Sequence, residues 1–322
     1  MTPQMQTMNS VFFDPVVNDD KRRRLLYGGQ LLVYSPTPSS LAFCQLAREL
    51  AKEAFAPLDP ETAQHHLPVE QYVAILAQLK PKFIHHPRSK ECIQGILREL
   101  RCEMSKMYFD VPRMRTATSG GYLTAGLAYA FHPHRDTWYS APQCQLNWWI
   151  PMYPIAPDNA MAFHPPYWSQ PVRNSSAGYN YYEWNQDSRK NAAKHIKTDT
   201  RKQPKAEEPM ELNPQVRVIP PVGGILIFSA AHMHSTVPNT SGRTRFSIDF
   251  RTVHIDDVLA KRGAPNIDSA CTGTTMRDYL RGTDLSHIPE ETCLLYDEKP
   301  PEGAELVFRP QPHSSAGYNH PR

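Results

Sequence analysis

The spacing of hydrophobic residues predicts a mostly helical N-terminal third. Between about residues 40 and 107, apolar side chains recur every three or four positions, which places them on one face of a helix. Ser39 or Ser40 suits the N-cap of the first helix, because a hydroxyl can accept a hydrogen bond from backbone N–H groups of the first turn. Residues 1–20 are expected to form a loose arm, and Leu25 to Tyr34 an early strand or a bend. The predicted helical ranges are about 40–56, a stretch from Pro60 that is interrupted at Pro68 and continues over Val69 to Leu79, and Ser89 to Met107.

From Met107 onward the pattern changes to short β-prone runs between turns. Aromatic and β-branched residues are separated by Pro, Gly and Ser, as in all-β proteins. Turns are expected at Pro112 to Met114 and at Ser119 to Gly121. Phe246 to Val253 alternates apolar and polar residues, as a half-buried strand does. The predicted strands are Met107 to Val111, Tyr122 to Phe131, Gln145 to Ile150, Ala160 to Phe163, Val216 to Ile219, Ile225 to Phe228 and Phe246 to Val253.

Two later stretches have few large apolar side chains. Residues 185–213 are polar and rich in lysine, and such a run cannot bury enough surface to order itself well, so it is predicted to be a flexible loop or lid. The aromatic run Tyr179 to Trp184 would cover a pocket as part of this lid. The tail from Asp256 is rich in proline and charge, with one short helix expected at Thr275 to Arg281. The string SSAGYN at residues 175–180 recurs at 314–319, which is too short for a structural repeat.

Composition narrows the class of protein. The chain has 322 residues, of which 40% are hydrophobic and 21% charged, as in ordinary soluble globular proteins. The net charge of +3 is small and dispersed, so nucleic acid is not an expected partner. None of the six cysteines forms a C-x-x-C pair, the first twenty residues do not resemble a secretory signal, and no apolar run approaches the roughly 20 residues needed to span a membrane. We therefore expect a cytoplasmic protein with reduced thiols and no membrane partner.

The most informative polar motif is His-Arg-Asp at residues 134–136. On a strand, residues two apart point to the same face, so His134 and Asp136 would stand together. An imidazole and a carboxylate on one face are two thirds of the 2-His-1-carboxylate set that holds non-haem Fe(II) and leaves positions open. The third ligand would then be a histidine further along the chain.

Two downstream histidines, His232 and His234, could supply that ligand, and both would face the same way on a strand. His132 shares the parity of His134, so the residues alone leave a second reading open. In that reading a cupin-like site of four histidines, at positions 132, 134, 232 and 234, would hold zinc or manganese.

The sequence after His234 adds a second functional element. A turn over residues 235–239 is followed by a strand in which Arg245 and Ser247 share one face. A guanidinium fork together with a hydroxyl is a suitable receptor for a carboxylate. The chain therefore offers a metal triad and, nearby, an anchor for an acid.

In combination these motifs resemble the Fe(II)/2-oxoglutarate-dependent dioxygenases, in particular the phytanoyl-CoA dioxygenase-like family. That family has His-x-Asp, a distal His about one hundred residues later, and an Arg-x-Ser whose Arg follows the distal His by about eleven residues. The matching elements here are residues 134–136, His234 and residues 245–247, and the resemblance covers roughly Met107 to Val253. This register selects His234, since the eleventh residue after His232 begins Arg-Thr-Arg, which has no serine.

The resemblance implies a mainly β fold with flanking helices (α+β) whose centre is a distorted double-stranded β-helix (jelly roll, cupin-like). The whole chain, 1–322, would be a single dioxygenase domain. Its helical N-terminal part would cover about 20–106 and its jelly-roll core about 107–255, with a lid or insertion at about 165–213 and a C-terminal tail at about 256–322.

The resemblance also implies a set of cofactors. Fe(II) would bind His134, Asp136 and His234, which are then the catalytic residues. 2-Oxoglutarate would chelate the iron as co-substrate, with its distal carboxylate on Arg245 and Ser247. O2 would take the last position on the metal.

Hydroxylation of a small molecule, with release of succinate and CO2, is the default outcome in this family, and desaturation or ring formation is a variation. Thr236 lies where the family often adds a hydroxyl to the grip on 2-oxoglutarate. Asp136 argues against halogenation, because related halogenases have Ala or Gly at this place.

For the substrate, Arg135 and Trp138 are the first candidates, because they lie closest to the metal motif in the sequence. Arg251 is expected to be a surface or interface charge, and His132 and His232 to be structural or to contact the ligands. A secondary-metabolism substrate is favoured because no long basic cleft suits the phosphates of CoA, and a homodimer is left open. Two alternatives are a cupin-like metalloprotein that does not use 2-oxoglutarate and a non-catalytic binding module of the same fold. The aromatic residues that either fill the core or line the pocket are Trp138, Tyr139, Trp148, Trp149, Phe163, Tyr167 and Trp168.

Overall fold

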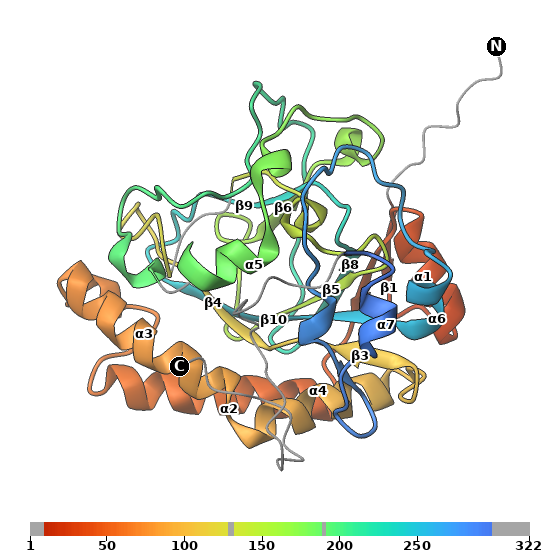
Figure 1. The fold of residues 1–322 in the computed structure, drawn as a ribbon. Coiled ribbons are helices and arrows are strands. Elements are labelled where there is room, and N and C mark those ends of the chain that lie inside the picture. The colour runs from red at the N-terminus through yellow and green to blue at the C-terminus, as the bar shows by residue number, and fades with distance from the viewer. Residues whose placement is uncertain (1–9, 128–131, 189–190, 298–322) are drawn as a thin grey trace.

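A computed structural model of the protein describes residues 10–127, 132–188 and 191–297. In this part of the chain a mixed β-sheet and a smaller antiparallel β-sheet pack against each other with helices on the outside (Figure 1). The larger sheet has the strand order β1-β2-β8-β5-β10-β3-β11, and β4 also pairs with β10. Among these described strands, β1 and β2 run parallel and the other pairs are antiparallel. The strand bounds are β1 (Val11–Phe13), β2 (Leu31–Tyr34), β3 (Met107–Phe109), β4 (Arg113–Ala117), β5 (Leu146–Pro151), β8 (Ile225–Ser229), β10 (Arg245–His254) and β11 (Leu280–Arg281).

The smaller sheet covers the inner face of the larger one. It has the order β7-β6-β9, with bounds β7 (Val216–Val218), β6 (Met161–Phe163) and β9 (His234–Thr236). Phe163 from β6 packs against Phe228 from β8, with ring centroids 5.0 Å apart. Two sheets packed in this way, with flanking helices, are consistent with a jelly-roll-like fold.

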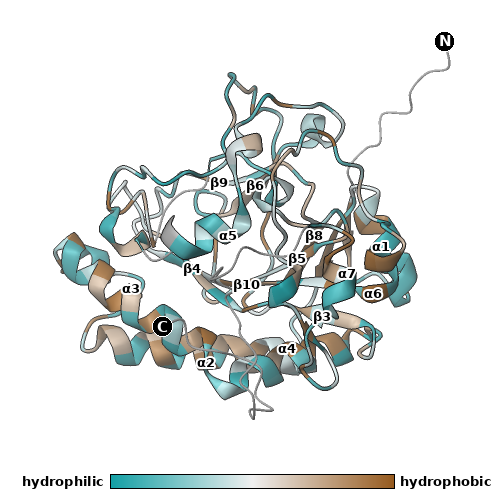
Figure 2. Ribbon diagram, viewed as in Figure 1, coloured by the Kyte–Doolittle hydropathy of each residue, from teal (hydrophilic) through white to brown (hydrophobic). Residues whose placement is uncertain are grey.

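Helices cover the outer face of the larger sheet. In Figure 1, α2, α3 and α4 lie together below the sheet, and Figure 2 shows strands β5 and β8 as mostly hydrophobic and the loops at the top as mostly hydrophilic. Phe246, Ile248 and Phe250 alternate along β10 and point into this helix-covered core. The helix bounds are α1 (Asp19–Tyr27), α2 (Pro38–Phe55), α3 (Val69–Ile84), α4 (Pro87–Glu99), α5 (Tyr181–Glu183), α6 (Ile255–Leu259) and α7 (Glu290–Cys293).

The predicted N-terminal helices are confirmed, with different ends. The N-cap of α2 is Thr37, whose hydroxyl accepts from the Ser40 backbone N–H at 3.2 Å while the Ser40 hydroxyl accepts from the Thr37 N–H at 2.9 Å. Pro60 does not start a helix, and only a 3-10 turn at Ala63–His65 precedes α3. The third helix ends at Glu99 and not at Met107, because Arg101 adopts a left-handed conformation with a φ of 56°.

The sequence pattern missed three elements, β1 and α1 near the N-terminus and β4 in the larger sheet. The expected loose arm instead contains the short strand β1 and the start of α1, and the first turns of α1 are too polar to show an apolar face in the sequence. Strand β4 begins at Arg113, where a turn was predicted, because Arg113 and Arg115 alternate with apolar residues and face inward. The predicted strand at Tyr122 to Phe131 is wrong over residues 122–127, and residues 128–131 lie outside the described part.

The remaining strand predictions agree with the structure, apart from details of burial. The predicted strands that became β3, β5, β6, β7, β8 and β10 are confirmed. Strand β10 is buried along most of its length and not half-buried, because it is central in the sheet and its polar residues face the interior. The helix expected at Thr275 to Arg281 is a 3-10 turn at Met276–Asp278 followed by β11. The second SSAGYN copy lies outside the described residues.

Candidate functional site

The two histidines of the predicted triad face each other across an antiparallel bridge. The His134 N–H donates to the His234 carbonyl and the His234 N–H donates to the His134 carbonyl, both at 3.0 Å. Asp136 does not continue a strand, as the motif suggested, but begins a 3-10 turn over Asp136–Tyr139. That turn places Asp136 Oδ1 at 3.4 Å from His134 Nε2 and 3.9 Å from His234 Nε2. One ligand atom from each of the three residues therefore lies within 4.8 Å of the others.

Backbone carbonyls fix the orientation of both imidazole rings. His134 Nδ1 lies 2.7 Å from the His132 carbonyl oxygen, and His234 Nδ1 lies 3.0 Å from the His232 carbonyl oxygen. A carbonyl oxygen can only accept, so each Nδ1 carries the proton and each Nε2 directs its lone pair toward Asp136. This is the usual arrangement of metal-binding histidines, whose second nitrogen donates to a carbonyl or carboxylate. His132 and His232 thus contribute backbone atoms to the site.

The ionisation states suit a cation. Burial alone would raise the pKa of Asp136, but the polar surroundings provided by His134 and His234 and the charge of Arg251 hold it well below its ordinary value. Burial and the neighbouring His134 lower the pKa of His234 to about 3. An ionised carboxylate and a neutral imidazole are the forms that bind a metal ion.

A hydrogen-bonded chain that the sequence analysis missed holds the carboxylate. Asn147 donates through Nδ2 to Asp136 Oδ2 at 2.9 Å, and Gln145 donates through Nε2 to Asn147 Oδ1 at 2.9 Å. Tyr279 in turn donates its hydroxyl to Gln145 Oε1 at 2.7 Å. The signal for the first two was present, because two amides two positions apart interrupt an otherwise apolar strand. Nothing in the sequence marked the tyrosine.

Arg135 and Trp138, the predicted substrate candidates, are buried away from the cavities. Arg135 Nε lies 3.0 Å from Asp268 Oδ1, and its Nη1 donates to the Ala231 carbonyl at 2.6 Å. The Trp138 indole N–H donates to the same Asp268 oxygen at 2.7 Å. Arg135 thereby links the motif at 134–136 to the segment just before His232, so its place between the two ligands serves to position them. The carboxylate that organises both side chains is in the C-terminal tail, where no sequence pattern singled it out.

A small cavity beside the triad contains the predicted acid anchor. It has a volume of about 90 Å³ and is lined by His134, Asp136, His234, Thr236 and Arg245, among others. Arg245 is 5% exposed, donates through Nη1 to the Asn159 carbonyl at 3.1 Å and lies over the Trp149 ring at 5.6 Å. Its Nε has no hydrogen-bond partner in the described structure. Burial lowers its pKa to about 10, so the guanidinium stays charged at neutral pH.

Ser247 lies two residues further along the same face of β10 and is fully buried. Its Oγ likewise has no partner among the described residues. A buried polar atom without a partner costs free energy, and a bound carboxylate would remove that cost for both side chains.

A wider cavity of about 430 Å³ also borders the triad. Both cavities are lined by His134, Asp136, Arg115 and Leu127. The triad therefore lies where the two cavities meet. Arg251 lines the wider cavity and is near Asp110, with Nε 3.4 Å from Oδ2, so it is not the surface charge that was expected.

The predicted cover of the pocket also borders this cavity. Tyr179, Tyr181 and Trp184 line it. In the described part of the predicted lid, residues 191–213 form one 3-10 turn at Ala192–Lys194 and are otherwise irregular. The flexibility of this segment stays a prediction. A third, outer cavity of about 680 Å³ shares Tyr139 and Arg201 with the wider one.

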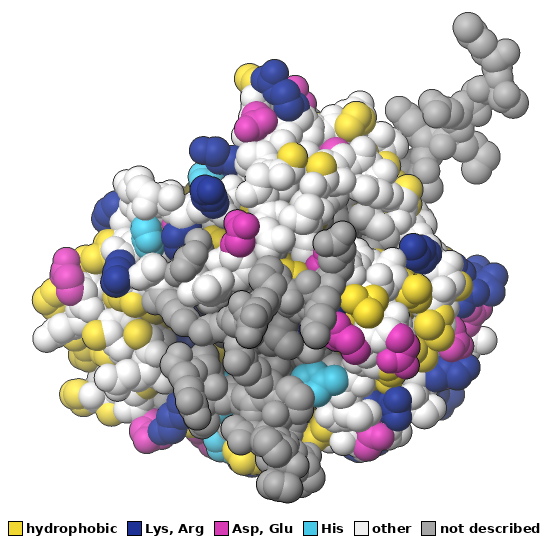
Figure 3. All heavy atoms as spheres, in the orientation of Figure 1, with side chains coloured by type: hydrophobic (Ala, Val, Ile, Leu, Met, Phe, Trp, Pro, Cys, Tyr) yellow, Lys and Arg dark blue, Asp and Glu magenta, His cyan; other side chains and the backbone are white. Residues whose placement is uncertain are grey.

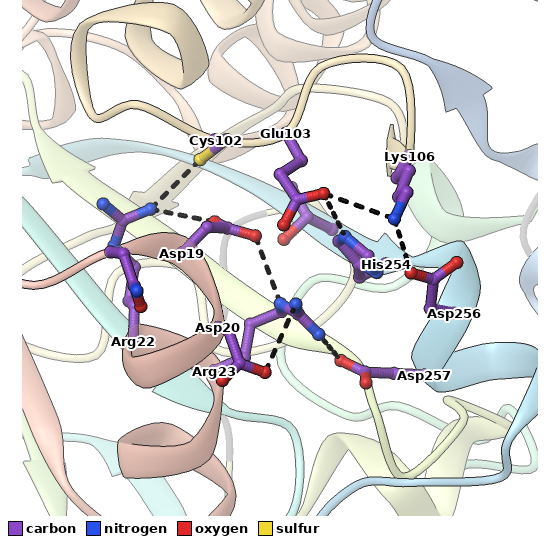
Figure 4. A network of polar contacts seen from close by, with 12 residues as sticks. Asp19, Asp20, Arg22, Arg23, Cys102, Glu103, Lys106, His254, Asp256 and Asp257 are labelled. Atoms are coloured by element: carbon purple, nitrogen blue, oxygen red, sulfur yellow. Dashed lines mark hydrogen bonds and ion pairs between the residues drawn. The ribbon is translucent and has the colours of Figure 1, made fainter.

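A second group of histidine and carboxylate side chains comes from other parts of the chain and has different neighbours (Figure 4). Asp19, Glu103 and His254 also bring ligand atoms within 4.8 Å of one another. However, one Asp19 oxygen accepts from Arg22 and the other from Arg23, each at 3.1 Å. A divalent cation would have to compete with two guanidinium groups for the same oxygens, so this group is an ion-pair network and not a metal site.

Two findings bear on the expected location. No helix in the described part of the chain has the length and apolar character to cross a bilayer. All six cysteines are free thiols. The cytoplasmic location stays a prediction.

Comparisons with known proteins give only distant likenesses. No protein-family model and no curated protein matches the sequence. Among solved structures, EvdO2 from Micromonospora carbonacea var. aurantiaca is 14% identical with a TM-score of 0.41, over 75% of this chain and 93% of EvdO2. SnoN, a non-heme alpha ketoglutarate dependent epimerase from nogalamycin biosynthesis, is 14% identical with a TM-score of 0.38, over 73% of this chain and 84% of SnoN. ThoJ, a non-heme monooxygenase, is 12% identical with a TM-score of 0.37, over 68% of this chain and 71% of ThoJ.

These neighbours include EvdO2 complexed with 2-oxoglutarate and SnoN in complex with Fe3+, alpha ketoglutarate and nogalamycin RO. At these identities and TM-scores the likeness assigns no activity to this chain. The resemblance to the phytanoyl-CoA dioxygenase-like family stays a prediction.

Proposed function

We propose that the protein is a non-haem Fe(II)- and 2-oxoglutarate-dependent oxygenase that acts on a small molecule. The proposal rests on one arrangement: two histidines and one aspartate lie where two cavities meet, and one of the cavities has a buried arginine with an unpartnered Nε. We further propose that the two sheets form the double-stranded β-helix of the phytanoyl-CoA dioxygenase-like family, in a single domain.

The donor set fits iron. Two neutral imidazoles and one carboxylate on one side of the ion would hold Fe(II) and leave coordination positions for other ligands. His134, Asp136 and His234 would be these ligands, with Asn147 fixing the carboxylate through its 2.9 Å hydrogen bond. The iron with 2-oxoglutarate and O2 supplies an oxidant for unactivated C–H bonds, with succinate and CO2 as the other products.

The small cavity fits 2-oxoglutarate. Its volume of about 90 Å³ is below the range of ordinary ligand pockets, which suits a short diacid. Arg245 would bind the distal carboxylate through Nε, Ser247 would donate its hydroxyl, and Thr236 lies on the cavity wall to add a second hydroxyl. Trp149, beneath the Arg245 guanidinium, keeps that charge in place.

The wide cavity would take the substrate. Its aromatic residues Tyr139, Tyr179 and Trp184 would exclude water around the reacting carbon, and their position beside His134 and Asp136 brings the substrate to the metal. Asp136 occupies the position that a halide would need, which argues against halogenation. Hydroxylation, the default outcome in the family that the motifs resemble, is the proposed reaction.

A spectroscopic titration tests the proposal. Without O2, adding Fe(II) and 2-oxoglutarate to the wild-type protein is expected to give a weak visible charge-transfer band, and Asp136→Ala is expected to show none. Glu103→Ala, in the ion-pair network around Asp19, is the matched control and should keep the band. If the wild type shows no band and forms no succinate in air, the proposal is wrong.

The all-histidine alternative is not supported by the geometry. His232 is buried with its Nε2 3.1 Å from the Gly29 carbonyl oxygen, and it is not part of the cluster of ligand atoms. His132 is exposed. Metal analysis of the purified protein tests the other alternative, a non-catalytic binding module, which would retain no iron.

A further inference from the structure

The wide cavity has an excess of positive charge on its walls. Its described lining includes the carboxylate of Asp136 and five cationic side chains, Lys80, Arg113, Arg115, Arg201 and Arg251. A cavity of about 430 Å³ is within the range of small-molecule sites. The charge of these walls therefore bears directly on which molecules can enter.

The arginines of this cavity already have carboxylate partners. The shortest distances between charged atoms are 3.0 Å for Arg115 with Asp249, 2.7 Å for Arg113 with Asp110, 3.4 Å for Arg251 with Asp110 and 2.5 Å for Arg201 with Asp199. Each of these positive charges is at least partly neutralised within the protein. Lys80, the remaining cation of this wall, has no such partner among the described residues.

Lys80 extends from α3, and its ammonium donates to the Leu127 carbonyl. No carboxylate among the described residues lies within ion-pair distance, 4.0 Å, of its Nζ. Burial and the nearby Arg115 lower the pKa of Lys80 to about 7, against the opposing effect of Asp249. A buried amine without a counter-ion costs stability, and a titratable group with such a strongly perturbed pKa in a cleft is a candidate for function.

Most of the other side chains of the wall are aromatic or apolar, and Asn185 and Gln203 are polar exceptions. Tyr139, Tyr179 and Trp184 line one part of the cavity, and Leu76 and Ile84, from the same helix as Lys80, line another. A ligand that matches this wall has a flat or apolar body and one acidic group.

The walls of the outer cavity also have an excess of positive charge. Lys197, Lys202 and Lys205 line it together with Arg201, which also lines the wide cavity, and Asp199 is the acidic side chain among its described lining residues. Figure 3, in the same orientation as Figure 1, shows Lys and Arg side chains on the part of the surface where Figure 1 draws the loops that follow α5. A basic approach of this kind raises the local concentration of anions and speeds their association.

We propose that the wide cavity binds an organic acid with an aromatic or largely apolar body, and that Lys80 binds its acidic group. This names the substrate class of the proposed oxygenase and rests on that function for the chemistry. The binding itself depends only on the cavity, so it can be tested separately.

The test uses matched probes and matched variants. Indole-3-propionate and 3-phenylpropionate are titrated against the full-length protein slightly below neutral pH, each beside its neutral amide, by ligand-observed NMR. The variants are Lys80→Met and the control Lys82→Met. Lys82 is on the same helix as Lys80, but its ammonium is half exposed and pairs with Glu53 of α2 at 2.8 Å. Arg245→Gln is included, because that arginine is the other anchor for an acid.

We expect each acid to bind more tightly than its amide to the wild type, to Lys82→Met and to Arg245→Gln. In Lys80→Met the acids should lose about tenfold or more in affinity, with the amides unchanged, because a charge-assisted hydrogen bond is lost. No preference for the acids, or a preference that persists in Lys80→Met, overturns the proposal.

A preference that disappears only in Arg245→Gln also overturns it, since the acids are then in the small cavity. Measured on protein without metal, the binding separates this proposal from the function. If binding depends on Lys80 but no succinate forms, the acid site is supported and the oxygenase function is rejected. If succinate forms but binding does not depend on Lys80, the oxygenase function is supported and the acid site is rejected.

Discussion

The cluster of His134, Asp136 and His234 and the group of Asp19, Glu103 and His254 have similar ligand atoms at similar spacing but different neighbours. In the first, the carboxylate accepts a neutral amide hydrogen bond from Asn147 and otherwise faces two imidazoles. In the second, both carboxylate oxygens of Asp19 accept from arginines, and Lys106 Nζ lies 3.5 Å from Glu103 (Figure 4). Spacing alone therefore does not identify a metal site.

What separates the two is which groups compete for the carboxylate. Neutral donors leave the negative charge available to an ion, whereas guanidinium groups neutralise it. The two groups also differ in exposure, because the Glu103 side chain is 45% exposed. The second group joins α1 to α6 through Arg23, which donates to Asp257, and so its role is structural.

The largest expected effect is on metal binding by the first cluster. Asp136→Ala removes the anionic ligand and should weaken Fe(II) binding by at least about 100-fold, which exceeds the usual effect of changing a residue behind a ligand. Anaerobic calorimetry with Fe(II), or with Mn(II) as a stable substitute, measures this. Asp19→Ala is the matched control and should bind metal as the wild type does, and equal losses in both variants would contradict the comparison.

The fold and the site were predictable from the sequence to different degrees. Apolar periodicity placed α2, α3 and most strands, because packing leaves a strong pattern. It failed where charged residues pack inside the protein, as in α1 with Arg22 and Arg23 and in β4 with Arg113 and Arg115, because they interrupt the apolar pattern. Two of their partners, Asp257 for Arg23 and Asp249 for Arg115, are also distant in the sequence.

The triad residues were predictable from motif spacing, but the geometry that unites them was not. His134 and Asp136 meet through a bridge and a 3-10 turn and not along one strand. Asp268, which fixes Arg135, comes from the tail more than 130 residues later, and a pairing at that distance leaves no local pattern.

The second expected effect is on stability and concerns the other group. Asp19→Ala leaves the side chains of Arg22 and Arg23, 4% and 5% exposed, without their shared partner. Breaking a buried ion pair in this way costs about 3–5 kcal/mol, which urea unfolding followed by circular dichroism would measure. Asp20→Ala is the control, because that carboxylate is 47% exposed, and should cost less than about 1 kcal/mol. If Asp19→Ala loses more free energy of metal binding than free energy of unfolding, the group around Asp19 is a metal site and not an ion-pair network.

A third, smaller effect tests whether the neutral donor matters. Asn147→Leu removes the amide that fixes Asp136 and should weaken metal binding by about 10–100-fold without abolishing it. Calorimetry with Mn(II) gives the affinity. Asn147→Asp should be worse than Asn147→Leu, because two carboxylates would then face each other. If Asn147→Leu binds as the wild type does, the orientation of Asp136 does not depend on this hydrogen bond.

The smallest expected effect concerns Lys80, a cation that has no carboxylate within ion-pair distance among the described residues. In the group around Asp19 a buried charge is neutralised and its removal destabilises, whereas Lys80 lacks a described counter-ion, so Lys80→Met should stabilise the fold by about 1–2 kcal/mol at pH 6. Its pKa in the folded protein is about 7, lowered from 10.5. Below pH 7 both the folded and the unfolded chain carry the proton, so the cost of burial is fully present.

Between pH 7 and pH 10.5 only the unfolded chain keeps the proton on Lys80, so wild-type stability rises with pH and the advantage of Lys80→Met shrinks. Thermal unfolding of Lys80→Met and Lys82→Met at pH 6 and pH 9 measures this difference. If Lys80→Met is instead less stable than the wild type at pH 6, the ammonium's hydrogen bond to the Leu127 carbonyl is its main contribution, and Lys80 belongs to the structural cations together with Arg22 and Arg23.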